Sequence, residues 1–304
     1  MAIIIGDLHL KHKEPYFRNQ QKFLDYLTEE FSNEVLIFLG DIFDVSSPKW
    51  VVYSMFKQFI LTRKEDTHII TGNHDISRIK GNSLENFQTI DGVTVYSDST
   101  EVTIEGHSCL MLPYKHNMDD YLDLKFEGDY TFCHFTNVED QFENEGMEIE
   151  GVSSRVVQIF GHTHTKTSYN TKGKQKILIG VPMITRNLES NNPLLRIEKD
   201  KKIVDVDIPT FINIVSLKFG EEIPNKDWLY NITDAPSRAS VYEKYKEENI
   251  RSFELNRTSI EEEVINKNSN MSIREKFKFW TKNNDISKEV TDATLKKLSD
   301  ASIY

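Results

Sequence analysis

The chain has 304 residues and a mass of 35.4 kDa, and 38% of its residues are hydrophobic while 28% are charged. This content supplies a sizeable core and excludes a disordered chain. With 37 Lys and Arg against 48 Asp and Glu, the formal net charge is −11, which excludes a uniformly basic nucleic-acid coat protein but not a local basic groove.

Cysteine content and hydropathy indicate the compartment. Cys109 and Cys133 are too few for a disulfide framework, suit a reducing cytosol, and are expected to be buried thiols. No apolar run approaches the roughly 18 residues of a membrane span. The first five residues lead directly into Gly6-Asp7, without a signal-peptide core or cleavage site. We therefore expect a soluble cytoplasmic protein that does not bind a membrane.

The first two thirds of the chain alternate short apolar runs with helix-length segments. The runs are rich in β-branched and aromatic residues, which predicts strands buried on both faces. The segments between them carry apolar stripes, and the alternation predicts an α/β chain. The expected strands are 2–5, 35–39, 68–71, 130–133 and 156–160, and the expected helices are 17–32 and 50–62.

The pattern then changes twice along the chain. From about residue 82 to 113, short strands with turn signals favour a layered sheet sandwich over a simple doubly wound sheet. Further strands are expected at 194–197, 203–206 and 212–217, and 227–239 is expected to be irregular. Segment 240–270 is charged and ambiguous. From Ser272 onward the pattern is helical, with Phe277 and Trp280 on one stripe.

Seven oxygen or nitrogen donors follow the expected strands, and none of them is a thiolate. Residues at the carboxyl ends of strands in an α/β sheet converge on one crevice. Carboxylate, imidazole and amide groups together suit Mn²⁺, Fe or Zn²⁺. Seven ligands are too many for one ion, so we expect two ions about 3.5–4 Å apart that share one aspartate. The donors are Asp7, His9, Asp41, Asn73, His134, His162 and His164.

The order of these donors resembles a known family. D-x-H, G-D-x-x-D, G-N-H-D, an isolated His and G-H-x-H occur here in the order typical of calcineurin-like metallophosphoesterases, over about residues 1–190. The resemblance implies a β-sandwich flanked by helices. It also implies that Asp41 bridges two divalent ions, with Mn²⁺ the expected metal and Mg²⁺, Fe or Zn²⁺ the alternatives. Asp7, His9 and His164 would complete the first site, and Asn73, His134 and His162 the second.

The resemblance also assigns two residues that are not ligands. His74 would face the scissile phosphate as a transition-state stabiliser or general acid, and Asp44 would orient it. Each residue has a simpler interpretation as well. An Asp or Asn after a strand is most often a turn or helix cap, and Asp44 fits the N-cap of the next helix. The joint occurrence of all the motifs favours the metal centre, while Asp75 is interpreted as local structure.

Three short motifs are similar to one branch, the SbcD-type double-strand-break-repair nucleases. They are 112–114 (L-P-Y), 134–135 (H-F) and 180–182 (G-V-P), and the short chain resembles the phage version, a recombination endonuclease subunit. This implies a nuclease domain over 1–208, a small cap over 209–268, and C-terminal helices over 269–304 that dock on an ABC-type ATPase. It also implies 3′→5′ exonuclease and single-strand endonuclease activity on DNA, in the host cytoplasm if the protein is phage-encoded.

Several alternatives stay open at this point. The same centre would serve a phosphodiesterase or phosphatase acting on a small or protein substrate, and a non-catalytic scaffold is a third hypothesis. Arg78 and Lys80 either contact a DNA phosphate or form a solvated face, and His116 lies beside L-P-Y without a required role. The stripe of Phe277 and Trp280 either docks a partner or closes the chain's own core. A homodimer is also possible.

Overall fold

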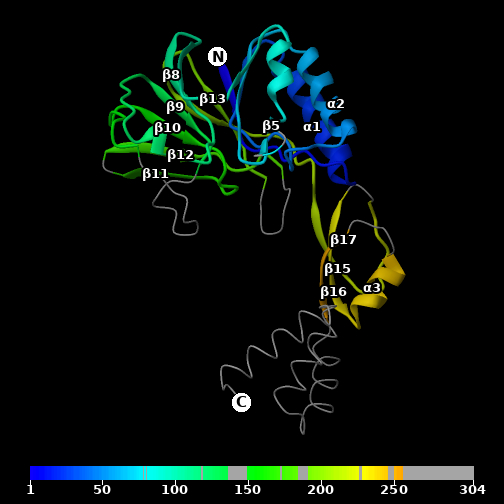
Figure 1. Cartoon of the computed structure of the whole chain (residues 1–304). Helices are drawn as coiled ribbons and strands as arrows, with labels where there is room; N and C mark the ends of the chain where they lie inside the picture. The colour runs from blue at the N-terminus through cyan, green and yellow to red at the C-terminus, as the bar shows by residue number, and fades with distance from the viewer. Residues whose placement is uncertain are drawn as a thin grey trace, which may run out of the picture. The chain divides into compact units, whose positions relative to one another are not determined.

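The computed structural model divides the chain into two compact units. The first comprises residues 1–214 and 225–229, and the second takes the rest. The structure describes residues 1–77, 79, 81–117, 119–135, 149–171, 173–183, 191–225, 228–245 and 250–255 (Figure 1).

The N-terminal half of the first unit builds a six-stranded sheet. Four neighbouring strands of this sheet are parallel, and the first two along the chain are the fully apolar runs Ala-Ile-Ile-Ile and Val-Leu-Ile-Phe, which is the pattern expected of strands covered on both faces. Two strands from later in the chain extend the sheet at one edge, each antiparallel to its neighbour. The sheet order is β14 (Ile203–Val206), β13 (Leu194–Ile197), β1 (Ala2–Ile5), β2 (Val35–Phe38), β3 (Thr67–Ile70) and β6 (Val93–Tyr96).

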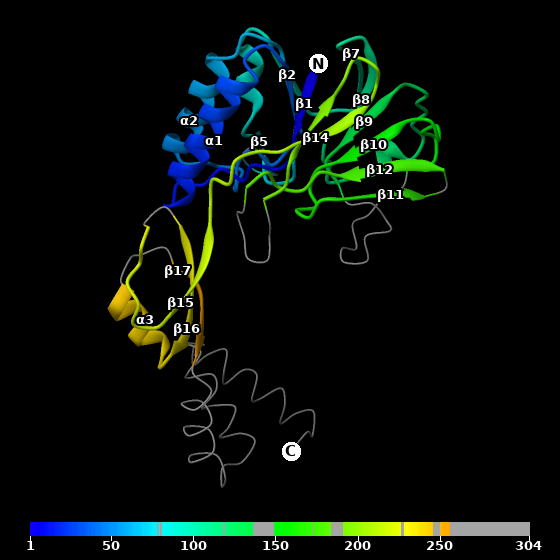
Figure 2. The ribbon, with the colours of Figure 1, turned by 180° about the vertical axis from the view of Figure 1, so that it is seen from behind.

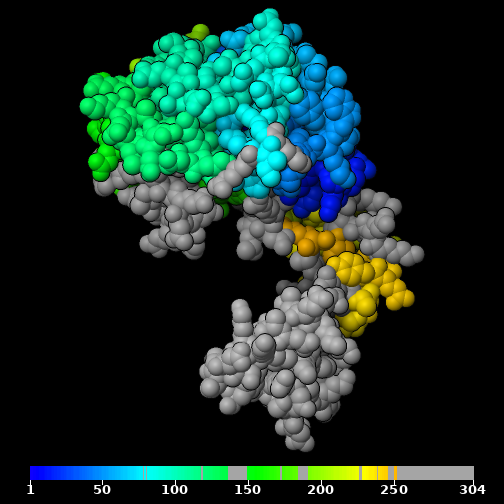
Figure 3. All heavy atoms as spheres, viewed as in Figure 1, coloured from blue at the N-terminus to red at the C-terminus, as the bar shows by residue number. Residues whose placement is uncertain are grey.

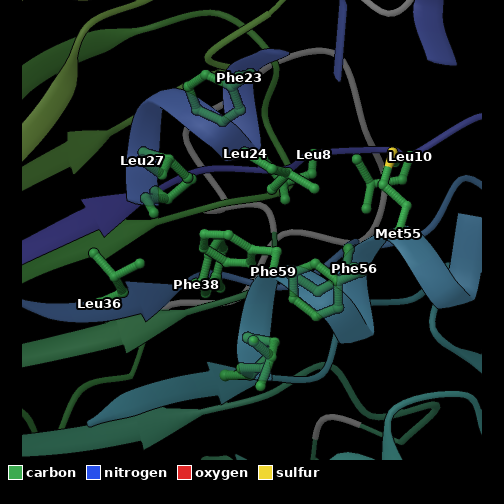
Figure 4. Close-up of a cluster of buried hydrophobic side chains, with 14 of the residues drawn as sticks. Leu8, Leu10, Phe23, Leu24, Leu27, Leu36, Phe38, Met55, Phe56 and Phe59 are labelled. Carbon is green, nitrogen blue, oxygen red and sulfur yellow. The ribbon is translucent and has the colours of Figure 1, made fainter. Parts of the chain in front are cut away.

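Two helices, α1 (Tyr16–Glu30) and α2 (Trp50–Leu61), cover the outer face of this sheet (Figure 2). Their apolar stripes pack on alternate residues of the strands, and Figure 4 shows Phe56 and Phe59 directed toward Phe38. The expected helices at 17–32 and 50–62 therefore form within one or two residues of the predicted ends.

A second six-stranded sheet packs on the inner face of the first. Its order is β11 (Thr167–Thr171), β12 (Lys174–Leu178), β10 (Val157–Phe160), β9 (Tyr130–Cys133), β8 (His107–Leu112) and β7 (Thr100–Ile104). The four central strands are again parallel. Apolar side chains from both sheets form one buried layer, which includes Cys109. In the space-filling view, the blue and cyan N-terminal part of the chain and the green part that follows it form one continuous surface (Figure 3). This arrangement is the layered α/β sandwich expected from the sequence.

Short elements complete the first unit. A two-stranded ribbon and a 3₁₀ turn follow β3, and a third buried cluster, which includes Cys133, covers the outer face of the second sheet. These short elements are β4 (Ile76–Ser77), β5 (Gly81–Asn82), η1 (Glu85–Thr89) and η2 (Asp119–Tyr121). No helix in the described part of the chain is both long and apolar enough to cross a membrane.

The second unit contains a three-stranded sheet, β15 (Ile214–Lys218), β16 (Leu229–Ala235) and β17 (Ile250–Leu255), with helix α3 (Arg238–Tyr245). The expectation of irregular structure over 227–239 is wrong, because the apolar side chains of β16 are buried despite its polar neighbours. The boundaries at 208 and 268 stay predictions. The C-terminal helices predicted over 269–304, with Phe277 and Trp280, lie outside the described residues.

Candidate metal centre

The polar side chains that follow the buried strands lie together at one edge of the two packed sheets. Parallel strands end at the same edge, so the loops after them meet there. The loops after β1, β2 and β3 bring Asp7, His9, Asp41 and Asn73, and those after β9 and β10 bring His134, His162 and His164. The structure thus brings all seven predicted donors together.

Asp7, His9 and His164 form the first group of donors, with one ligand atom from each within 4.8 Å of the others. His9 Nε2 lies 3.0 Å from His164 Nε2, and His164 Nε2 lies 3.6 Å from Asp7 Oδ2. Asp7 Oδ2 is buried and has no hydrogen-bond partner among the described residues. A buried carboxylate oxygen beside two converging imidazole nitrogens is the surrounding that a bound cation would satisfy.

Asn73, His134 and His162 converge in the second group. The Asn73 amide oxygen lies 3.0 Å from His134 Nε2 and 3.0 Å from His162 Nδ1. The other ring nitrogen of His134, Nδ1, lies 2.5 Å from the carbonyl oxygen of Leu39. A proton on Nδ1 donated to that carbonyl leaves the Nε2 lone pair directed into the centre.

The Asp41 carboxylate lies between the two groups. Its Oδ1 is 3.3 Å from His134 Nε2, and its Oδ2 is 3.5 Å from His9 Nε2. The same Oδ1 accepts a 2.8 Å hydrogen bond from the backbone N–H of His74. One oxygen directed to each side is the arrangement required of a carboxylate shared by two ions.

His74 lies at the margin of the centre and contacts Asp44. Its Nδ1 is 2.7 Å from the main-chain carbonyl of Asp44, which places a proton on Nδ1 and directs Nε2 away from that contact. The Asp44 carboxylate lies 3.3 Å from Lys11 Nζ and 3.7 Å from His9 Nδ1. Asp44 is not the N-cap of α2, because that position is Lys49.

Three of the seven donors have a left-handed backbone, which only glycine adopts without cost. The φ angles are +44° at His9, +47° at Asp41 and +69° at His162. Such conformations are uncommon for non-glycine residues and collect at functional sites. This strain turns the loops sharply after β1, β2 and β10, and nothing in the residue pattern predicted it.

Two glycines allow the close approach of the ligand loops. A Cβ placed on Gly72 would come 2.1 Å from Asp41 Oδ1, and one on Gly40 would come 2.4 Å from His134 Nδ1. Both contacts are far below van der Waals distance. Any side chain at these positions would displace Asp41 or His134.

Two amide side chains that the sequence analysis did not single out hold the ligand loops. Gln20, buried on α1, donates from Nε2 to the carbonyls of Leu8 and His9 and accepts from the Lys11 N–H. Asn192 donates to the carbonyl of His164 at 3.3 Å. The signal for Gln20 is a polar residue inside an apolar helical stripe; Asn192 carries no comparable signal.

Asp75 braces the loops without belonging to either donor group. Its carboxylate accepts hydrogen bonds from the backbone N–H groups of Gly72, Ile42 and Phe43. Burial, reinforced by the charge of Asp41, raises the pKa of Asp75 to about 7. The interpretation of Asp75 as local structure agrees with these contacts.

The charged groups of the centre shift one another's pKa values. Burial raises the pKa of Asp7, and the charge of Asp41 adds to this. Burial acts in the same direction on Asp41, but the surrounding imidazoles, His134 first, outweigh it and lower the pKa of Asp41 below its usual range. Burial alone would lower the pKa of His134, yet Asp41 and Asp7 raise it to about 10. Two buried carboxylates thus create a site that favours positive charge.

The donor chemistry fits divalent metal ions. The sets Asp7–His9–His164 and Asp41–His134–His162 each offer carboxylate and imidazole ligands. A third set combines Asp41 with His9 and His74. Nitrogen and oxygen donors without thiolate suit Mn²⁺, Fe or Zn²⁺ in a catalytic rather than a structural site. The assignment of each residue to one ion stays a prediction.

The remaining candidates lie apart from these groups or outside the described residues. Arg78 and Lys80 are not among the described residues. His116 is exposed and contacts Tyr114, with ring centroids 5.6 Å apart. Cys109 and Cys133 are buried free thiols, as expected.

A match to a known protein family agrees with this geometry. A family model for calcineurin-like phosphoesterases matches residues 2–166. A solved structure described as a novel archaeal phosphodiesterase is similar at 17% identity with a TM-score of 0.40, covering 67% of this chain and 98% of that one. No curated protein sequence matches the chain.

Proposed function

The chain belongs to the calcineurin-like phosphoesterase family and is a metal-dependent phosphoester hydrolase, and from this premise we propose that it is a two-metal DNA nuclease. The proposed activity is 3′→5′ exonuclease and single-strand endonuclease cleavage. The protein would be the catalytic subunit of an SbcCD-type recombination and repair complex, and its metal would be Mn²⁺.

Each side chain of the centre has a definite part in this proposal. Asp7, His9 and His164 would hold one ion, Asn73, His134 and His162 would hold the other, and Asp41 would be shared between them. When bound, such ions neutralise the phosphodiester and supply a hydroxide nucleophile at neutral pH.

His74 acts on the substrate rather than on the metals. Its Nδ1 proton is donated to the Asp44 carbonyl, so Nε2 is the atom that carries a second proton toward the phosphate. In that state the imidazolium stabilises the charge that develops on the phosphoryl oxygens, and it delivers the proton to the leaving 3′ oxygen.

The observation that supports DNA as the substrate is the position of the branch-type motifs. The N–H of Tyr114, in L-P-Y, donates to the carbonyl of Thr71 at 2.8 Å, two residues before Asn73. The N–H of Val181, in G-V-P, donates to the carbonyl of His164 at 3.3 Å. Motifs that resemble the nuclease branch therefore brace ligand loops, which supports a centre of that type.

Two other functions compete with the nuclease. A phosphodiesterase or phosphatase for a small or protein substrate would use the same centre, and the net charge of −11 favours it mildly. The second unit, surplus to the family match over 2–166, favours a macromolecular substrate or partner. A non-catalytic scaffold would require neither the full donor set nor His74.

The ABC-type ATPase partner belongs to the same proposal. Helices expected within 269–304 would dock on its coiled coil, with Phe277 and Trp280 at the contact. A homodimer formed through the helices beside the centre remains a separate proposal. Leu24 and Tyr53 lie on these helices, and nothing in the sequence marks either as an interface residue; Leu24 is buried in the core at 1% exposure, which makes it unavailable for one, and Tyr53 is half-buried.

The deciding experiment compares a DNA duplex labelled at one blunt end, single-stranded DNA, and bis-p-nitrophenyl phosphate, each with Mn²⁺, Mg²⁺ or chelator. We expect Mn²⁺-dependent shortening of the duplex and cleavage of the simple diester. An Asp41→Ala variant is the control, because it removes the shared ligand and should abolish both activities. Cleavage of the simple diester with intact DNA under every metal would overturn the nuclease and favour a small-substrate phosphodiesterase.

A further inference from the structure

A column of three aromatic rings runs from the core to the surface beside the metal centre. Phe43, fully buried, stacks on Tyr53 with an interplanar angle of 20°, and Tyr53 stacks on Trp50 at 21°. The outermost ring, the indole of Trp50, is 73% exposed. An indole that is open to solvent at the end of a column of rings offers a flat surface on which another aromatic ring can stack.

The column ends in an open groove of about 620 Å³. Trp50, Tyr53 and Lys57 form one wall, because positions i, i+3 and i+7 of α2 share a face, which lies beside the buried face of the helix. Ser46, from the loop before α2, and Asn86, from η1, supply polar groups. The groove therefore combines a flat aromatic surface, hydrogen-bonding groups and one ammonium group. We call it the Trp50 groove.

The Trp50 groove adjoins the His74 side of the metal centre. Ser46 lies two residues after Asp44, whose carbonyl contacts His74. On the other wall, Ser83 donates its N–H to the carbonyl of Asp75, the residue after His74, at 2.9 Å. A strand with one phosphodiester at the centre would therefore pass the groove within a short distance.

The charge of the groove matches a nucleic acid strand. Among the described residues, its lining includes Lys57 and no acidic side chain, although the chain carries a net charge of −11. The groove also lies at the N-terminal end of α2, which no side chain caps and where the helix dipole favours negative charge. A purely apolar partner would gain nothing from Lys57.

We propose that the Trp50 groove is a subsite that stacks an unpaired nucleobase of the strand being cleaved, with the base continuing the column of Phe43, Tyr53 and Trp50. The inference rests on the proposed nuclease function and deepens it. Base stacking on an aromatic ring tolerates any sequence, because every base has a π-face. The subsite thus directs the enzyme to single-stranded or frayed DNA without reading its sequence.

The test measures kcat/KM for a single-stranded oligonucleotide and for bis-p-nitrophenyl phosphate, which has no base. For Trp50→Ala we expect the ratio of oligonucleotide to diester cleavage to fall about 5- to 150-fold, the range that base–aromatic stacking spans. Trp50→Phe keeps a ring and should recover part of the loss. Leu61→Ala, at the far end of α2 and also exposed, is the matched control and should leave the ratio unchanged.

Oligonucleotides with a single abasic site identify the stacked base. At one position relative to the cut, removing the base should lower cleavage by the unmodified protein but add nothing to the loss caused by Trp50→Ala. Equal losses on both substrates, or no loss on the oligonucleotide, would overturn the subsite. So would a Trp50→Ala variant that turns a dimer into a monomer while oligonucleotide cleavage is unchanged, because the groove would then be an interface between copies.

A binding measurement separates this inference from the nuclease function. Quenching of tryptophan fluorescence by an oligonucleotide, in the presence of chelator, should be present in the unmodified protein and lost in Trp50→Ala. Binding through Trp50 without any DNA cleavage would overturn the nuclease but retain the subsite. Absence of both binding and cleavage, with the simple diester still hydrolysed, would overturn both.

Discussion

His74 and Asp44 illustrate how main-chain groups position a reactive side chain. The Asp44 carbonyl accepts the Nδ1 proton of His74, so the tautomer of His74 is set by a group that every amino acid carries. The Asp44 carboxylate lies near Lys11. The chemistry of residue 44 therefore matters less than the path of its backbone.

Substitutions at these two positions should have unequal effects. His74→Gln removes the group proposed to protonate the leaving oxygen, and we expect a loss of about 10²–10⁴-fold in kcat with metal content retained. Asp44→Asn keeps the carbonyl contact, and we expect less than about tenfold loss. Steady-state hydrolysis of bis-p-nitrophenyl phosphate, together with metal analysis of the purified proteins, measures both.

Loss of metal from His74→Gln would contradict the assignment, since it would make His74 a ligand like its neighbours His9 and Asp41. A loss in Asp44→Asn as large as that in His74→Gln would show that the carboxylate, rather than the carbonyl, orients the ring.

At the scale of the elements, continuous burial made the strands predictable. β1, β2, β3, β9 and β10 are buried at nearly every position because both of their faces are covered, and the sequence analysis located each of them within a residue or two. The donors were predictable for a related reason, since they follow these strands directly.

What the sequence did not predict depends on contacts between distant segments. The segment that contains β16 was expected to be irregular, because it carries Pro236 and polar turn residues. The bracing of His9 by Gln20 depends on where α1 packs, and the Trp50 groove depends on which face of α2 the core leaves open. The local periodicity of the sequence encodes neither the partner of Gln20 nor the face of α2 that stays open.

The packing of the second sheet predicts the behaviour of the two thiols. Burial raises the pKa of Cys109 and of Cys133 to about 12, so at pH 8 roughly one thiol in 10⁴ is ionised. We expect the native protein to react with Ellman's reagent at neither cysteine on the minute timescale, and the protein in guanidinium chloride to react at both. Rapid release of one equivalent from native protein would show that the layer between or outside the sheets opens.

At the scale of the whole phosphoesterase unit, the centre joins two sheets. Asp7, Asp41 and Asn73 follow strands of the first sheet, while His134, His162 and His164 follow strands of the second. An ion held by both sets binds the folded state and not the unfolded chain, so it stabilises the unit by mass action.

Metal should therefore raise the melting temperature. At a free concentration about 100 times the dissociation constant, stabilisation of about 2.7 kcal/mol corresponds to a rise of roughly 5–10 °C for a unit of this size. Scanning calorimetry with Mn²⁺ and with EDTA measures the shift, and Asp41→Asn should lose most of it. An unchanged melting temperature in the unmodified protein would contradict a centre shared between the sheets.

The pairing of β1 with β13 has a consequence for synthesis on the ribosome. β2 can pair with β1 once the first 38 residues have emerged, but β13 ends at Ile197, about 160 residues later. At typical elongation rates of about 5–20 residues per second, this takes on the order of ten to thirty seconds. During that time one edge of an all-apolar strand lacks its partner, and such an edge pairs readily with other chains. Until about two thirds of the chain have been made, the open edge of its first strand therefore leaves the nascent protein prone to pairing with other chains.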